Sequence, residues 1–427
     1  MTLQDILDPL LDASWKGFPH HSPALRRSAV GSQGWNVLRG DLPLPLAVIR
    51  RDALGGNLQW MQGFAGSHGV GLAPHGKTTM SPQLFQRQLD AGAWGLTFAT
   101  VTQLRAGVTA GAKRCLIANQ VFQAVDLQGI ADLKRANTGL SVAFLVDSLA
   151  QAELIEAWYA VNAHVEPFDV LLEIGVDGGR TGCRSHEQAL AVAKRLRSGK
   201  ATRLVGIECY EGLGATGESD ADKAYANALM QRVRDIAQAC DERQLFETDE
   251  ILLTAGGSAI FDLVAEHLKM NLSRPVQGLL RSGCYVTHDQ GTYHRFMNTV
   301  AARMGCGHGL NAAMQVWAAV QSCPEPGLAI LAVGKRDISY DLELPVPLGL
   351  CKAGEATMTP APADWKIAGL NDQHAYLRGS GPEHQSLRVG DLVALGISHP
   401  CTTFDKWRWM PVVDEQNNVC DAIVTCF

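Results

Sequence analysis

A lysine in a glycine-rich segment is the first residue of this chain whose type and surroundings indicate chemistry. Residues 71–78 read GLAPHGKT and match the P-loop pattern G-x-x-x-x-G-K-[ST], in which backbone N–H groups and the lysine bind nucleotide phosphates. Residues 141–147, SVAFLVD, resemble the apolar strand whose terminal aspartate holds Mg²⁺ in such proteins. Taken alone, the two segments predict an NTPase with Lys77 on the phosphates.

Other features of the same region argue against a P-loop. Residues 70–73 are short and weakly apolar for a central strand, and Met80-Ser81-Pro82 delays the next helix beyond Lys77. A P-loop also needs an open sheet. A lysine can alternatively form a Schiff base with a carbonyl compound and later act as a base. The remaining alternative is an ordinary solvated lysine.

A histidine and a cysteine near the end of the chain form the second candidate site. Residues 398–401 read Ser-His-Pro-Cys, so His399 and Cys401 lie two positions apart and can face the same side of an extended segment. Imidazole and thiolate are preferred ligands of zinc. Two ligands alone are a weak signal, and a buried histidine beside an inert cysteine is the alternative.

The elements that position these residues follow from an alternation of apolar runs and helical patterns. Such alternation predicts parallel strands joined by crossover helices. Eight units fit a closed (β/α)₈ TIM-type barrel better than an open doubly wound sheet, and the active sites of such barrels lie at the carboxyl ends of the strands. The eight predicted strands are residues 70–74, 95–98, 114–118, 141–146, 168–174, 203–210, 250–254 and 277–282.

The pattern changes at both ends of the barrel. Residues 1–42 are expected to be an N-terminal extension, and residues 43–300 the barrel. Short strand-like runs punctuated by prolines predict a C-terminal all-β domain over residues 301–427. The apolar strand at residues 43–49 precedes the barrel and can pair with this second domain.

Composition narrows the class of protein. The chain has 427 residues and a net charge of −6, from 37 basic and 43 acidic residues, which argues against a nucleic-acid partner. The 11 cysteines form no CxxC pairs, and the acidic start does not resemble a signal peptide. An apolar run of about 18 residues is missing, so no membrane span is expected. We expect a cytoplasmic protein with reduced thiols.

Two early segments carry a family resemblance that covers nearly the whole chain after residue 43. PLAVIRRDALGGNLQWMQ, followed by GLAPHGKTTMSPQLFQRQLDAG, resembles the start of the fold-type III pyridoxal phosphate enzymes, which have alanine racemase-like barrels. The similar branch is that of D-serine dehydratase and D-threonine aldolase. Its Pro-His-x-Lys-Thr segment carries the lysine that binds the cofactor, which implies this role for Lys77.

The resemblance extends to the segments after the fifth and sixth strands. LEIGVDGGRTG at residues 172–182 is similar to the family motif whose arginine contacts the phenolic oxygen of the cofactor, which implies that role for Arg180. A salt bridge to Asp177 is the alternative. Tyr210 is expected to lie against the pyridine ring, with a core position at the top of the barrel as its alternative.

Two glycine-containing loops are assigned to the cofactor phosphate by the same resemblance. Glycines at strand ends let backbone N–H groups approach an anion, and barrels often bind phosphate after strands seven and eight. The implied cofactor-binding residues are Gly256, Gly257, Ser258, Gly283, Cys284 and Tyr285.

The resemblance also assigns the His399–Cys401 pair. D-serine dehydratases of this type bind Zn²⁺ through His-x-Cys, whereas the aldolases show His-x-Asp, so His399 and Cys401 imply a zinc-assisted dehydratase. His374, which lies in a segment similar to the family just upstream, can line the site.

The implied reaction is α,β-elimination from a D-amino acid with a β-hydroxyl, converting D-serine to pyruvate and ammonia, in a homodimer. Three alternatives stay open. The first is dehydration of D-threonine or 3-hydroxyaspartate, or cleavage by a D-threonine aldolase. The second is a cofactor-carrying or regulatory barrel without turnover, and the third is the NTPase.

Overall fold

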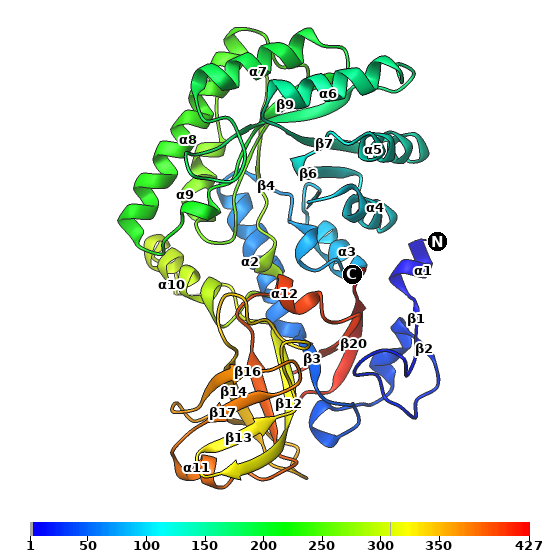
Figure 1. Ribbon diagram of the computed structural model, residues 1–427, viewed down its shortest axis with the longest axis vertical. Helices are drawn as coiled ribbons and strands as arrows, with labels where there is room; N and C mark the ends of the chain where they lie inside the picture. The colour runs from blue at the N-terminus through cyan, green and yellow to red at the C-terminus, as the bar shows by residue number, and fades with distance from the viewer. Residues whose placement is uncertain (1–2, 308) are drawn as a thin grey trace.

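The computed structural model describes residues 3–307 and 309–427. These form a β-strand barrel surrounded by helices, with a β-domain below it in Figure 1. Eight parallel strands make one sheet in the order β4-β11-β10-β9-β8-β7-β6-β5. They are β4 (Gly71–Leu72), β5 (Leu96–Phe98), β6 (Arg114–Gln120), β7 (Ser141–Val146), β8 (Phe168–Ile174), β9 (Thr202–Cys209), β10 (Ile251–Ala255) and β11 (Val276–Leu280).

The two edge strands of this sheet, β4 and β5, meet just beyond their ends. His75 forms an isolated parallel bridge with Thr97, and the Trp94 N–H donates to the Leu72 carbonyl at 2.7 Å. The sheet therefore closes almost completely, and the predicted (β/α)₈ barrel is confirmed.

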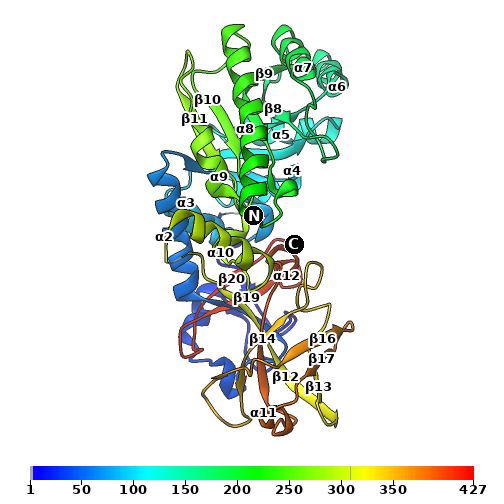
Figure 2. The ribbon, with the colours of Figure 1, turned by 90° about the vertical axis from the view of Figure 1, so that its left-hand side faces the viewer.

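Helices separate the strands and cover the outside of the barrel (Figure 2). They are α2 (Arg51–Ser67), α3 (Pro82–Asp90), α4 (Val101–Thr109), α5 (Ala124–Ala136), α6 (Leu149–Ala160), α7 (His186–Ser198), α8 (Ser219–Glu242) and α9 (Phe261–Ala265). A further helix, α10 (Thr292–Met304), follows the last strand. The sequence analysis did not predict α10, and the boundary expected at residue 300 falls inside it.

The barrel interior is packed rather than hollow. Along β7 the buried side chains alternate, because successive residues of a strand point to opposite faces. Ala143 and Leu145 belong to a small apolar cluster with residues of the neighbouring strands, whereas Phe144 belongs to the large core beneath the helices. A filled interior leaves room for a cavity only at the mouth of the barrel.

The β-domain is built on the long strand β12 (Met314–Glu325), in a sheet ordered β15-β14-β18-β12-β13-β17-β16. Strand β3 (Leu46–Arg50) pairs antiparallel with β12 and parallel with β19, so this N-terminal strand joins the C-terminal domain. The other strands are β13 (Leu328–Leu331), β14 (Val346–Cys351), β15 (Thr359–Pro360), β16 (Lys366–Leu370), β17 (Ala375–Arg378), β18 (Leu392–Gly396), β19 (Trp409–Val413) and β20 (Val419–Val424), with short helices α11 (Pro382–Gln385) and α12 (Cys401–Phe404).

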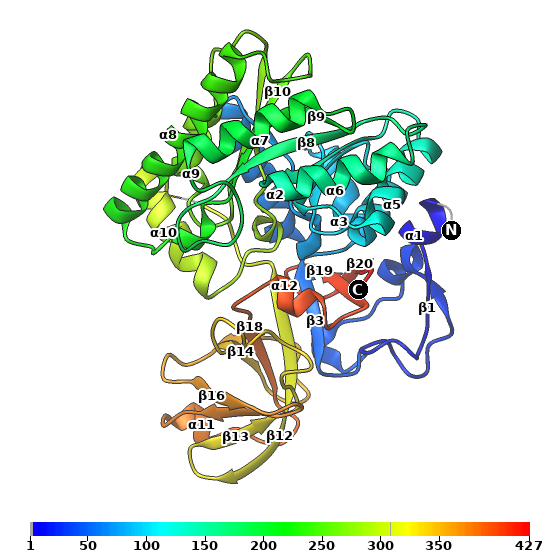
Figure 3. The same cartoon turned by 45° about the horizontal axis from the view of Figure 1, so that its top comes forward.

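The N-terminal segment packs beside the end of the chain (Figure 3). It contains α1 (Leu3–Leu7), β1 (Leu10–Leu11), β2 (Leu25–Arg26) and the 3₁₀ turns η1 (Arg27–Ser32) and η2 (Val37–Arg39). Arg27 forms an ion pair with Asp421 at 2.6 Å, and the Phe18 ring lies 5.4 Å from that of Trp409. The segment therefore extends the β-domain side of the molecule. In the described part of the chain, none of the helices is long and apolar enough to cross a membrane.

Candidate active site

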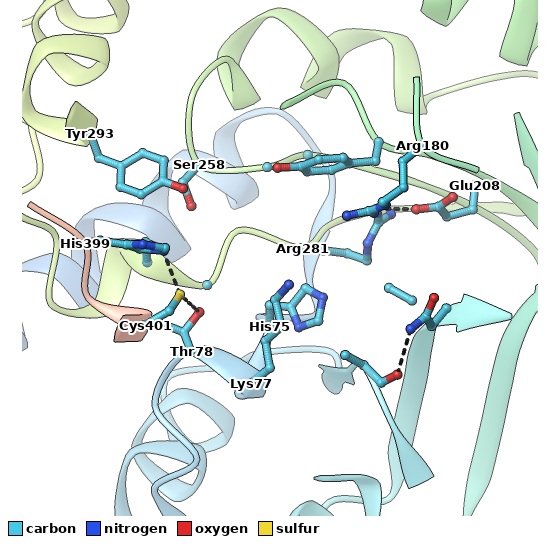
Figure 4. Close-up of a pocket in the computed structure, with 18 residues that line it drawn as sticks. His75, Lys77, Thr78, Arg180, Glu208, Ser258, Arg281, Tyr293, His399 and Cys401 are labelled. Carbon is cyan, nitrogen blue, oxygen red and sulfur yellow. Dashed lines mark hydrogen bonds and ion pairs between the residues drawn. The ribbon is translucent and has the colours of Figure 1, made fainter. Parts of the chain in front are cut away.

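A cavity of about 390 Å³ lies where the mouth of the barrel faces the β-domain (Figure 4). Its size is that of a site for a small ligand. Residues from nine segments of the chain line it. They include Lys77 beyond β4, Arg180 beyond β8, Tyr210 beyond β9, Ser258 beyond β10 and His399 from the β-domain.

Lys77 reaches the cavity from a tight turn, η3 (Gly76–Thr78). A Cβ on Gly76 would lie 2.6 Å from the Phe98 ring, so the turn packs closely on β5. Helix α3 begins only at Pro82, where the Ser81 side chain caps the Leu84 N–H. The segment thus forms no P-loop, because Thr78 does not lie in the first turn of a helix.

His75 shows that this part of the cavity is electropositive. The residue is half-buried, and its buried Nδ1 has no hydrogen-bond partner among the described residues. Burial, followed by the charges of Lys77, Arg281 and Arg180, lowers the pKa of His75 well below its ordinary value. A site that keeps an imidazole neutral beside three cations is suited to binding an anionic ligand.

Arg180 lies above the Tyr210 ring, with its guanidinium carbon 5.1 Å from the ring centroid. Its loop after β8 folds back on the strand, because the Cys183 N–H donates to the Glu173 carbonyl at 2.8 Å. No ion pair with Asp177 forms within the described residues, so the alternative assignment of Arg180 is not realised. Its guanidinium faces the cavity, where it can meet a phenolic oxygen.

A buried ion pair between Glu208 and Arg281 lies at the base of the cavity. Arg281 also donates to Thr254 Oγ1 at 2.7 Å and to the Cys209 carbonyl at 3.1 Å. Burial raises the pKa of Glu208, and the charge of Arg281 opposes this rise. Glu208 Oε2 and Arg281 Nε are buried and have no hydrogen-bond partner among the described residues.

The two glycine loops expected to hold a phosphate lie side by side at the mouth. The Ser282 hydroxyl donates to the Gly257 carbonyl at 2.6 Å and ties the loops together. The carboxylate of Glu211 accepts the N–H of Gly256 at 2.9 Å and that of Gly257. These two N–H groups were predicted to bind phosphate, but in the structure a carboxylate already occupies them.

The remaining amides of the loops fit an anion better. Within the described chain, no protein acceptor contacts the backbone N–H groups of Ser258, Gly283 and Cys284. A Cβ on Gly283 would lie 2.6 Å from Thr78 Oγ1 and 2.7 Å from the His75 carbonyl, so the approach of the loop requires glycine there. These amides form a cradle suited to a phosphate.

Tyr285 does not line the cavity, and its predicted contact with the cofactor is wrong for the side chain. It lies in η6 (Cys284–Val286), where consecutive side chains point about 120° apart. Cys284 therefore faces the cavity, while the buried Tyr285 hydroxyl accepts a hydrogen bond from Gln88 of α3 at 3.3 Å. His374 is also absent from the cavity lining, since it lies in the turn between β16 and β17.

His399 and Cys401 face each other across the β-domain edge of the cavity (Figure 4). Asp341 Oδ2 lies 2.6 Å from His399 Nδ1, which orients the ring and leaves Nε2 toward the cavity. A hydrogen bond from Cys284 lowers the pKa of Cys401 well below its ordinary value, and His399 adds to the effect. Burial opposes protonation of His399, but its bonds to Cys401 and Asp341 outweigh burial and raise its pKa to about 9.

This donor set fits a metal ion. The carboxylate–histidine arrangement and a favoured thiolate are typical of a zinc site. The described residues contain no group of three or more metal-ligating side chains, so an ion here would take two protein ligands. Its other positions would be left to water and substrate, as in a catalytic site.

Several cavity residues were not predicted from the sequence. Glu208 and Arg281 lie near the ends of two predicted barrel strands, and a charged residue at such a position was a signal that could have identified them. Asn119, near the end of β6, also lines the cavity. Tyr293 enters from α10, where nothing in the sequence marked it, and Cys284 and burial raise its pKa.

Comparison with known proteins places this geometry in a family. Residues 49–279 match the family model described as "Alanine racemase, N-terminal domain", and residues 313–413 match the model described as "Putative serine dehydratase domain". The chain is 26% identical over 369 residues to a D-threonine aldolase from an Arthrobacter species, covering 84% of this chain and 85% of the relative.

A second relative is a D-threo-3-hydroxyaspartate dehydratase from Delftia sp. strain HT23. It is 32% identical over 200 residues, covering 45% of this chain and 49% of the relative. The crystal structure of D-threonine aldolase from Filomicrobium marinum is similar in fold, with a TM-score of 0.76 at 23% identity, covering 92% of this chain and 97% of that one. The first family model spans more than half of the residues, and the protein belongs to the alanine racemase N-terminal domain family, the barrel of the fold-type III pyridoxal phosphate enzymes.

Proposed function

We propose that the protein is a pyridoxal phosphate-dependent, zinc-assisted dehydratase of D-β-hydroxy amino acids that converts D-serine to pyruvate and ammonia. The observation that carries the proposal is the His399–Cys401 pair in the same cavity as Lys77. A lysine and a metal-binding pair within one small cavity can act on adjacent carbon atoms of one substrate. The names of the two curated relatives support the substrate class, since both act on D-amino acids with a β-hydroxyl.

The cofactor fits the barrel half of the cavity. When bound, pyridoxal phosphate supplies an electron sink for negative charge that develops at the substrate α-carbon. Lys77 Nζ would hold the aldehyde carbon, and Arg180 would meet the phenolic oxygen. The free amides of Ser258, Gly283 and Cys284 would hold the phosphate. During turnover Lys77 Nζ accepts the α-proton, and Arg180 keeps its charge throughout because its proton is not lost in proteins.

The metal pair fits the other half. His399 Nε2 and Cys401 Sγ would hold Zn²⁺, which supplies Lewis acidity toward the β-hydroxyl leaving group. Asp341 keeps the imidazole in one orientation through its 2.6 Å contact with Nδ1. The thiolate of Cys401 favours dehydration over aldol cleavage, because the resemblance places an aspartate at this position in aldolases.

The charges around the cavity favour a substrate with an uncharged β-substituent. Among the described residues, the lysine and arginine side chains that line the cavity are Lys77, Arg180 and Arg281. Arg281 is already paired with Glu208, and the other two face the proposed cofactor position. A second carboxylate, as in 3-hydroxyaspartate, would find no unpaired lysine or arginine in the cavity and would have to compete with the β-hydroxyl for the proposed metal. This supports D-serine, with D-threonine as the second candidate.

One set of measurements tests the proposal. Purified protein supplied with pyridoxal phosphate is expected to show the visible absorbance of a lysine-bound cofactor, to change spectrum with D-serine, and to release pyruvate. Lys77→Ala removes the absorbance, whereas Lys134→Ala, a lysine on α5 outside the cavity, leaves it in place. Chelation with EDTA stops pyruvate release without bleaching the protein.

The outcome that contradicts the proposal is equally concrete. Glycine and acetaldehyde from D-threonine, with no 2-oxo acid from D-serine, would identify an aldolase. Turnover of D-threo-3-hydroxyaspartate faster than D-serine would overturn the charge argument, which predicts a kcat/KM lower by about a hundredfold or more for the dicarboxylate.

Quaternary structure and location are also part of the proposal. The family resemblance implies a homodimer, and the reduced cysteines are compatible with the cytoplasm, where thiols stay reduced. Analytical ultracentrifugation of the loaded enzyme is expected to give a dimer, and a monomer at working concentration contradicts this expectation.

A further inference from the structure

Two cysteines from different parts of the molecule meet in the cavity. Cys284 lies beyond β11 in the barrel and Cys401 begins α12 in the β-domain, 117 residues apart in sequence. Their Sγ atoms are 3.7 Å apart, and both side chains line the cavity. Cys284 is buried, while Cys401 is partly exposed.

This pair differs from the other cysteines of the chain. All 11 cysteines are free thiols. Elsewhere in the described chain no two cysteine sulfurs contact each other, and the partners are groups such as Met230, 3.6 Å from Cys209, or the Asp147 carbonyl, 3.2 Å from Cys183. The close approach of Cys284 and Cys401 is therefore particular to this cavity.

The distance is short enough for bond formation with little movement. A disulfide joins two sulfurs at about 2.05 Å, so the two atoms must approach each other by about 1.7 Å. Rotation about the side-chain bonds of the partly exposed Cys401 gives movement of this size. The contacts that hold Cys401 now are a hydrogen bond to Thr78 Oγ1 at 3.4 Å and the bond to His399, and neither is covalent.

We propose that Cys284 and Cys401 form an oxidation site, in which hydrogen peroxide joins them in a reversible disulfide. Cys401 sulfur attacks one peroxide oxygen, the O–O bond breaks, and one water leaves as a sulfenic acid forms. Cys284 sulfur then attacks the oxidised sulfur, the S–S bond forms, and the second water leaves. The two thiols lose two electrons and two protons, and the peroxide is reduced to two waters.

The disulfide removes one of the two proposed metal ligands. Cys401 sulfur, once bonded to Cys284, is no longer a thiolate, and His399 alone is a weak site. This consequence rests on the proposed function, whereas the bond itself needs neither cofactor nor metal. The barrel and the β-domain also become covalently linked across the cavity. Oxidation would thus disable the enzyme and leave its fold intact.

The experiment uses the full-length protein, with its metal removed by EDTA and with a small excess of hydrogen peroxide. The expected product has lost the mass of two hydrogens, carries a disulfide-linked peptide pair containing residues 284 and 401, and returns to the starting mass with dithiothreitol. Oxygen adducts on Cys401 without a linked pair, or a disulfide between other cysteines, would overturn the proposal.

Two variants and one further readout separate the oxidation site from the proposed function. Cys284→Ser is expected to lose the linked peptide and accumulate oxygen adducts at Cys401. Cys323→Ser, which removes an exposed cysteine of β12, forms the link as the natural protein does. After oxidation, zinc retained on dialysis is expected to fall more than about tenfold and to recover with dithiothreitol. A disulfide that forms with zinc retention unchanged would overturn the metal site of the proposed function and leave the oxidation site standing.

Discussion

The two halves of the cavity are held in different ways. In the barrel half, backbone geometry and a buried ion pair hold the side chains, since Lys77 sits on a turn packed against β5 and Arg281 is fixed by Glu208. In the β-domain half, single polar side chains hold the site. Ser339 Oγ accepts the His399 N–H at 3.2 Å, and Asp341 contacts the His399 ring.

This difference predicts that mutations in the two halves have different effects on stability and binding. A site held by strand ends and tight loops is rigid and shared with the rest of the barrel core, so changes in it affect stability as well as binding. A site held by individual side-chain contacts can be weakened without unfolding the protein. Mutations in the barrel half should therefore lower stability as well as binding, whereas mutations in the β-domain half should weaken binding with little effect on stability.

The largest predicted effects come from removing the central group of each half. Lys77→Ala is expected to abolish cofactor absorbance and lower activity by on the order of a thousandfold or more, while zinc still binds.

His399→Ala is expected to keep the absorbance, lose zinc, and lower activity by on the order of a hundredfold or more. Absorbance spectra and metal analysis of both variants check this. Loss of both groups in either variant would show that the halves are not independent.

The buried ion pair of the barrel half provides the next effect. Arg281→Met leaves the buried Glu208 without its cation and is expected to lower the free energy of unfolding by about 3–5 kcal/mol. The double variant Glu208→Gln with Arg281→Met should recover part of this loss, because no uncompensated charge remains.

An exposed ion pair serves as the matched control. Arg295 and Glu343 pair at the surface, where their side chains are 60% and 37% exposed. Arg295→Met is expected to change the free energy of unfolding by about 0–1 kcal/mol, as is usual for exposed pairs. Urea unfolding of the metal-free protein measures both pairs. Equal losses in the buried and exposed pairs would contradict the rigidity assigned to the barrel half.

In the β-domain half, Asp341→Asn tests a contact outside the metal ligands. The variant loses the carboxylate that orients His399, and zinc affinity is expected to fall about 10–100-fold with little change in stability. Competition with a colorimetric chelator measures the affinity. Asp372→Asn, a surface aspartate of the same domain, is the control, since its exposed side chain pairs with the exposed Arg336. A fall in melting temperature without loss of affinity would assign Asp341 a purely structural role.

Much of the barrel half could be predicted from the sequence. All eight strands were located, because the alternation of apolar runs and helical patterns survives small errors at their ends. Lys77 and Arg180 were then placed at strand ends, where barrel sites lie. Glu208 and Arg281 lie near the ends of predicted strands too, but a strand pattern does not show which of its last side chains face inward.

The remainder of the site depends on tertiary contacts that no local pattern encodes. Asp341 lies in an irregular segment, so nothing in its surroundings pointed to His399. Tyr285 was assigned to the cavity because of its neighbours in sequence, but the η6 turn rotates it toward α3. Cys284 and Cys401 come from different domains, so their contact could not be predicted from either local sequence.

The junction between the halves gives the smallest predicted effect, through a buried histidine. His288 follows η6, is 2% exposed, and its Nε2 has no partner among the described residues. Burial, together with the nearby His294, lowers its pKa to about 3, from an ordinary value of 6.5. A buried neutral histidine contributes stability above pH 6.5, and this contribution is lost as the pH falls from 6.5 toward 3. Between pH 7.5 and pH 5 the loss is about 2 kcal/mol.

The variant His288→Asn tests this at the junction without straining the backbone. His288 has a φ of +49°, in the left-handed region that asparagine adopts more readily than most residues. Between pH 7.5 and pH 5, the free energy of unfolding is expected to fall by about 2 kcal/mol less in the variant than in the natural protein. Urea midpoints at constant slope measure this difference. His186→Asn, at an exposed position on α7, is the control. If the free energy of unfolding of His288→Asn depends on pH as strongly as that of the natural protein, His288 is not the source of the loss. The junction between the halves would then be less rigid than the barrel half.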